Sequence, residues 1–94
     1  MYEYPLNDSW STQEIVTVVN LLNAVETAYE KGIELAKFQQ YYQAFKQVVT
    51  SIGEEKRIDK SFAQASGYSL YRVVTQMKQL QTSNNAKRKQ IIKL

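Results

Sequence analysis

The 94-residue chain lacks cysteine and histidine, and it contains only three glycines and one proline. Without cysteine it has no disulfide, thiolate nucleophile or cysteine-ligated metal. Without histidine the Ser-His, Cys-His and His-metal chemistries are excluded, because histidine is the commonest general base and metal ligand near neutral pH. We therefore expect no cofactor or metal and a protein that is not an enzyme. The scarcity of glycine and proline favours long helices over a fold with many turns.

Long apolar runs are absent as well. The N-terminus has no basic stretch followed by an apolar run, which a signal peptide would need. The apolar runs are also too short to span a membrane. We therefore expect a cytoplasmic protein with no membrane partner. A single short chain has a thin core, so a homodimer is one way to bury further apolar surface.

Acidic residues are missing from the last third of the chain, residues 61–94. Residues 1–36 contain six acids and one lysine, whereas residues 37–94 contain eleven basic residues and three acids. The net charge of +3 therefore hides a strong asymmetry. Such an asymmetry permits an anionic partner or head-to-tail self-association.

Helix signals begin at Ser11, which with Glu14 fits a capping box. Trp10 and Ile15 are spaced as the hydrophobic staple that often accompanies such a cap. Apolar residues then recur every three or four positions, and Gly32 is a natural helix stop. A second helix is predicted over about residues 34–50, with an apolar stripe. The stripe comprises Leu35, Phe38, Tyr42, Phe45, Val49 and Ile52.

Two further helices are predicted, starting at serine caps. Ser51 with Glu54 fits a second capping box, and Ser69 caps the last helix. The third helix carries Ile58, Phe62 and Ala65 on one face, and the fourth carries Leu70, Val73, Met77 and Leu80. We therefore predict an all-α fold, a small antiparallel four-helix bundle within residues 1–82 that begins with an extended N-terminal segment.

A basic C-terminal tail, residues 83–94, follows the predicted bundle. It contains Lys87, Arg88 and Lys89, and later the apolar residues Ile91 and Ile92. Two alternatives are open for it: the tail frays, or it lies extended over the bundle with its apolar residues as anchors.

Carboxylates and tyrosines are the remaining groups with chemical potential. Glu26, Glu30 and Glu34 share a helix face, and Glu54, Glu55 and Asp59 form a second group. Paired carboxylates serve acid–base or metal chemistry, but the helical-bundle metal site also needs histidine, so we expect solvated helix faces and least favour a hydrolase. Of the seven tyrosines, we expect Tyr29, Tyr42 and Tyr71 to be at least half-buried, and Tyr2, Tyr4 and Tyr41 to be exposed.

Residues 62–80 resemble a helix-turn-helix unit. Ala63 is the small residue of its first helix, Gly67 makes the left-handed turn, and Val73 is an apolar residue of its second helix. Gln76 departs from the pattern, which calls for an apolar residue there. With the tail, this unit supplies the candidate interaction residues. They are Tyr68, Tyr71, Arg72, Gln76, Lys78, Lys87, Arg88 and Lys89.

A set of short sequence pieces spans residues 4–72. The pieces are Tyr4-Pro5-Leu6, Trp10-Ser11-Thr12, Glu14-Ile15-Val16, Tyr29-Glu30-Lys31-Gly32, Tyr42 with Phe45-Lys46, Lys56 with Ile58, Phe62, and Ser66-Gly67-Tyr68-Ser69 with Tyr71. In this order and spacing the chain resembles the uncharacterised protein family UPF0223 of Gram-positive bacteria. The resemblance implies a small all-helical cytoplasmic protein and adds no catalytic residue. The basic tail lies outside it.

These observations predict a non-catalytic protein-interaction or regulatory module, with a protein partner or a second copy as the ligand. The alternative is nucleic-acid binding through the helix-turn-helix-like unit and the basic tail.

Overall fold

A computed structural model describes residues 6–82 and 90–94 of the chain. These residues form four α-helices and two short strands. In chain order they are α1 (Thr12–Glu30), β1 (Ile33–Glu34), α2 (Leu35–Val48), α3 (Ile52–Ser66), α4 (Leu70–Gln81) and β2 (Ile91–Ile92). The predicted all-helical class and the four helices are therefore confirmed, and the strand pair is an addition that the sequence did not predict.

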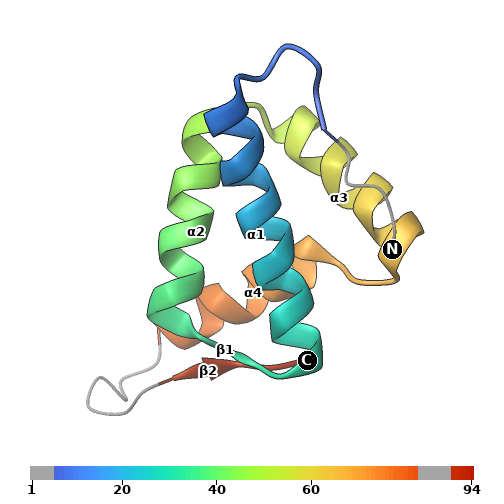
Figure 1. Cartoon of the computed structure of the whole chain (residues 1–94). Helices are drawn as coiled ribbons and strands as arrows, with labels where there is room; N and C mark the ends of the chain where they lie inside the picture. The colour runs from blue at the N-terminus through green and yellow to red at the C-terminus, as the bar shows by residue number, and fades with distance from the viewer. Residues whose placement is uncertain (1–5, 83–89) are drawn as a thin grey trace.

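One pair of helices packs closely, and the other two cross it at an angle (Figure 1). α1 and α2 lie side by side and run antiparallel, while α3 is followed by α4, which crosses behind α1 and α2 near the strands. α4 contacts each of the other three helices. In the described residues, no helix is long and apolar enough to cross a membrane.

The helix starts follow the predicted caps. At α1 both bonds of the capping box form: the Ser11 amide donates to Glu14 Oε1 over 2.8 Å, and the Glu14 amide donates to Ser11 Oγ over 3.2 Å. Trp10, just before this cap, packs partly buried against the core. Ser51 and Ser69 cap α3 and α4 by accepting a bond from the amide of the third helical residue, Glu54 and Arg72. Of the two bonds of the capping box predicted at Ser51, this is the one that forms within the described residues.

The core is apolar throughout the described residues and draws on every helix. Phe38 and Phe45 of α2 meet Phe62 of α3 and the leucines of α1, all without measurable exposure. No buried polar or charged residue interrupts it. Because the apolar stripes of all four helices converge on this one cluster, the described chain folds as a single unit.

The last residues return to the body of the molecule. β2 pairs antiparallel with β1, with Ile33 opposite Ile92. The Leu35 amide donates to the Gln90 carbonyl over 2.8 Å, and Ile92 is fully buried. Of the two alternatives for the predicted tail, residues 90–94 therefore take the extended one. Lys87, Arg88 and Lys89 lie outside the described residues.

Four side chains lie differently from the prediction. Ile52 does not extend the α2 stripe, because the turn at 49–51 resets the helical phase and makes it the exposed first residue of α3. Tyr71 is exposed because Leu70 and Val73 hold the core face of α4. Ala65 is exposed as well, whereas Tyr41, expected at the surface, packs partly against the core. Tyr2 and Tyr4 lie outside the described residues.

Candidate functional site

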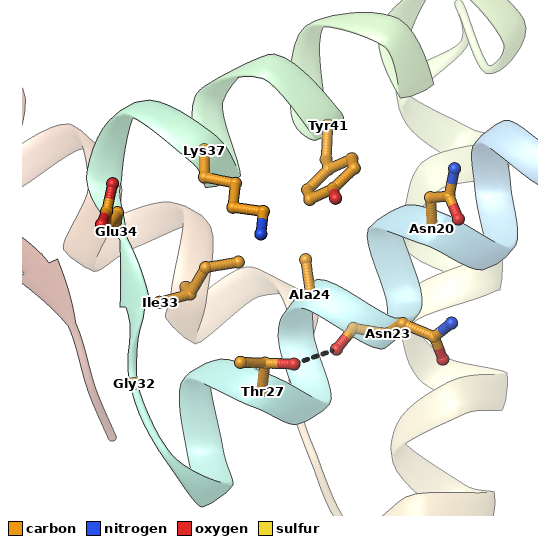
Figure 2. A pocket seen from close by; sticks show the side chains of 9 residues that line it. All are labelled: Asn20, Asn23, Ala24, Thr27, Gly32, Ile33, Glu34, Lys37 and Tyr41. Atoms are coloured by element: carbon orange, nitrogen blue, oxygen red, sulfur yellow. Dashed lines mark hydrogen bonds between the residues drawn. The ribbon is translucent and has the colours of Figure 1, made fainter.

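A polar cleft of about 480 Å³ lies between α1 and α2, beside β1. Figure 2 shows Asn20 and Thr27 of α1 on one side, with the Lys37 and Tyr41 side chains of α2 extending toward it from the other. Its apolar residues, Ala24 and Ile33, are buried in the core. The cleft therefore offers polar side chains and no exposed apolar anchor to a ligand.

A second hollow, of about 520 Å³, lies where α2, α3 and α4 meet. We call it the three-helix groove. Its lining includes Tyr42 and Lys46 of α2, Ile52, Glu55, Lys56 and Asp59 of α3, and Leu70, Tyr71, Val74 and Lys78 of α4. It differs from the polar cleft because large apolar side chains at its edge reach solvent.

The apolar part of the three-helix groove has a buried floor and an exposed rim. Leu70 and Val74 form the floor and belong to the core, being 1% and 7% exposed. Ile52 and Tyr71 stand on the rim and are 66% and 71% exposed. Large apolar side chains that cluster at a hollow in this way are typical of a binding surface.

Glu55 is held by two neighbours inside the groove. Its Oε1 atom accepts a bond of 2.8 Å from Lys46 Nζ and one of 3.2 Å from the Tyr42 hydroxyl. Burial raises the pKa of Tyr42 to about 12, and the negative charge of Glu55 and its hydrogen bond act in the same direction. The phenol therefore stays protonated at neutral pH and serves as a hydrogen-bond donor to the carboxylate.

Asp59 is held by the start of α4. Its two carboxylate oxygens accept bonds from the Leu70 amide (2.9 Å) and the Tyr71 amide (3.3 Å). Ser69 Oγ accepts from the next amide, that of Arg72, over 3.3 Å. The first amides of α4, where a helix attracts anions, are therefore already satisfied within the chain.

The remaining charges of the groove are lysines. Lys56 of α3 and Lys78 of α4 are exposed, and neither takes part in an ion pair within the described part of the chain. Together with Lys46 of α2, each of the three helices supplies one lysine to the groove. Three lysines face two carboxylates, Glu55 and Asp59, so the groove has an excess of one positive charge.

The predicted interaction residues are only partly brought together. Tyr71 and Lys78 line the three-helix groove, and Arg72 is exposed on α4 outside its lining. Gln76 faces the other way: its Oε1 atom accepts a 2.9 Å bond from the Lys93 amide and so holds the chain end that carries β2. The helix-turn-helix pattern lacked an apolar residue here because the position serves this contact.

Tyr68 belongs to the turn between α3 and α4 and attaches this turn to α1. Its ring stacks on Tyr29 with centroids 4.6 Å apart. Its hydroxyl donates to Glu30 Oε2 over 3.0 Å, and this bond raises the pKa of Tyr68. Gly67, with φ of 81°, makes the left-handed stop of α3 as predicted. These contacts of Tyr68 hold the turn against α1.

Sequence reasoning missed the contribution of Ile52, Lys46 and Lys56 to the groove. One signal for Ile52 was present: a cap at Ser51 makes the following residue the start of a new helix, so Ile52 cannot also continue the α2 stripe. The lysines carried no such signal, because their common location depends on how three helices pack. The two predicted carboxylate groups do not come together as a metal site in the described residues.

The fold and its groove define a small all-helical protein with an open, positively charged surface hollow. The chain belongs to the uncharacterised protein family UPF0223, whose model matches residues 1–87. It is 52% identical to a UPF0223 protein of Listeria monocytogenes over 82 residues, which cover 87% of this chain and 91% of the relative. It is 54% identical to a UPF0223 protein of Enterococcus faecalis over 77 residues, which cover 82% of this chain and 84% of the relative.

Proposed function

We propose that this protein is a non-catalytic interaction module that docks a segment of a partner protein in the three-helix groove. The observation that carries the proposal is the exposure of Ile52 and Tyr71 above the apolar floor of the groove. Aromatic and aliphatic side chains of this kind are the usual anchors of protein interfaces. A chain without histidine or cysteine suits binding better than catalysis.

Nucleic-acid binding through α3, the turn and α4 is the second candidate. Arg72 and Lys78 are exposed on α4 and favour it. Asp59 weighs against it, because its carboxylate occupies the α4 amides that would bind a phosphate. We therefore favour docking of a protein segment over nucleic-acid binding.

Photocrosslinking from the groove tests the proposal. A photoreactive benzoyl-phenylalanine is placed at position 71 of the full chain, or at position 16, where Val16 is also exposed but lies on α1. In extract from the source organism, we expect a defined protein adduct from position 71 and not from position 16. Unlabelled wild-type chain should compete for it, whereas an Ile52→Glu chain should not. Identical adducts from both positions, or equal competition by both chains, would contradict docking in the groove.

A further inference from the structure

We propose that the three-helix groove takes an acidic protein segment that carries a bulky apolar side chain. The inference rests on the proposed function and names the chemical class of the partner. It draws on the charges around the groove, which are independent of the exposed apolar residues that located the site.

The acids of the groove already have hydrogen-bond partners within the chain. Glu55 is paired with Lys46 at 2.8 Å and also accepts from the Tyr42 hydroxyl. Asp59 faces the positive end of the α4 helix dipole and accepts two of its backbone amides. A positively charged ligand would therefore share both carboxylates with donors that the fold already supplies.

The groove contains three lysines and two carboxylates, which leaves an excess of one positive charge. Lys56 and Lys78 come from different helices, line the same hollow and have no ionic partner among the described residues. A basic segment lying on Ile52 and Tyr71 would bring like charges close to both lysines, whereas an acidic segment would form new ion pairs with them.

The apolar centre sets the second requirement. A phosphate backbone would pair with the lysines but would leave the apolar side chains of Ile52 and Tyr71 uncovered. A purely apolar segment would cover the rim and leave the lysines unpaired. A segment with acidic residues on either side of a leucine or phenylalanine meets both requirements, with the apolar side chain packing between Ile52 and Tyr71.

A second copy of the chain fits the groove less well than a separate partner. The acidic residues at the end of α1 are the obvious candidate from the same molecule, but Glu30 already accepts a bond from Tyr68, and Glu26 also has a partner. Glu34, predicted on the same helix face, lies in β1 because α1 ends at Glu30, and it has a partner too. Docking these residues would require these contacts to break.

Fluorescence anisotropy with the full chain tests the inference. The probe is a short labelled peptide with a Leu-Phe centre flanked by glutamates. Its counterparts carry glutamine or lysine in place of glutamate, or serine in place of Leu-Phe. We expect the acidic peptide to bind about tenfold more tightly than the glutamine and serine peptides, and more weakly as salt rises from about 50 to about 200 mM. The lysine peptide should not bind.

Matched variants locate the binding. Replacing Lys56 and Lys78 together by glutamate should weaken the acidic peptide about tenfold, while Lys60→Glu, an equally exposed change on α3 outside the groove lining, should not. Ile52→Glu should abolish binding, and Val16→Glu on α1 should retain it. Circular dichroism confirms that each variant is folded.

Each other outcome overturns the inference in a distinguishable way. If the glutamine peptide binds as tightly as the acidic one and Ile52→Glu still abolishes both, the groove docks a segment but its partner is not acidic. If no peptide binds while labelled duplex DNA does, in a manner sensitive to salt and to Arg72→Ala, the nucleic-acid alternative replaces the proposed function. If sedimentation shows a dimer that Ile52→Glu dissociates, the occupant is a second copy.

Discussion

At the scale of single residues, the environment of a side chain decides its chemistry, and Tyr42 is the clearest case. Its hydroxyl donates to Glu55 from a partly buried position, which raises its pKa to about 12. Folding therefore keeps a proton on this phenol that the unfolded chain releases near the ordinary tyrosine value of about 10. Because the folded state holds the extra proton, the stabilisation is complete below about pH 10 and is lost as the pH rises toward 12.

The prediction is that Tyr42→Phe flattens the loss of stability between about pH 10 and 12. Urea unfolding across this range measures it, with absorbance at the phenolate band reporting the ionisation. Glu55→Gln is the informative comparison. Glu55→Gln should reduce the loss of stability between these pH values without abolishing it, because burial is the largest cause of the raised pKa of Tyr42. Identical pH slopes for wild type and Tyr42→Phe would show that the phenol is not held as the structure has it.

At the scale of elements, two glycines end two helices but differ in the space around their Cα atoms. Gly32 and Gly67 both adopt left-handed φ values, of 90° and 81°. A Cβ atom at Gly67 would meet open space, whereas one at Gly32 would lie 2.9 Å from Ile91 Cγ2 of β2. Gly32 is therefore needed both for its backbone conformation and for the close approach of Ile91, whereas Gly67 is needed for its backbone conformation alone.

We predict that Gly67→Ala costs about 1–2 kcal/mol of unfolding free energy, the penalty of the left-handed conformation. Gly32→Ala should cost more, because the Ile91 side chain of β2 must also move away from the added methyl group. Denaturant unfolding gives both values, and hydrogen exchange should show faster opening of the Leu35 amide, which donates to Gln90, in Gly32→Ala alone. Equal costs would mean that β2 does not contact this turn.

At the scale of the whole molecule, the end of the chain completes the core. Ile92 is fully buried between the helices, while its neighbour Ile91 is 49% exposed. Strand geometry explains the difference, because successive side chains point to opposite faces. The family match ends at residue 87, so this strand lies beyond the matched residues.

Ile92→Ala should therefore lower the unfolding free energy by about 2–5 kcal/mol, a large share of the stability of a small domain. Ile91→Ala, the same chemical change one residue away, should stay within about 0.5 kcal/mol of wild type. Thermal or urea unfolding of the two variants is the measurement. Similar unfolding free energies for Ile92→Ala and Ile91→Ala would show that β2 does not pack against the core.

The sequence by itself determined the helical class, the helix starts and most of the core. Caps such as Ser11 with Glu14, and stripes such as Phe38 and Phe45, depend on residues within one or two helical turns, so local spacing is enough to predict them. The same holds for Gly67, whose left-handed stop follows from its lack of a side chain.

The groove, by contrast, was decided only in the tertiary structure. Ile52, Tyr71 and the lysines of the groove come from segments far apart in sequence, and whether a stripe residue is buried depends on which face a neighbouring helix covers. The pairing of β2 with β1 is also long-range, joining residues 33–34 to 91–92. Such contacts depend on how the helices pack, which local periodicity does not encode, and they place the candidate site where the three helices meet.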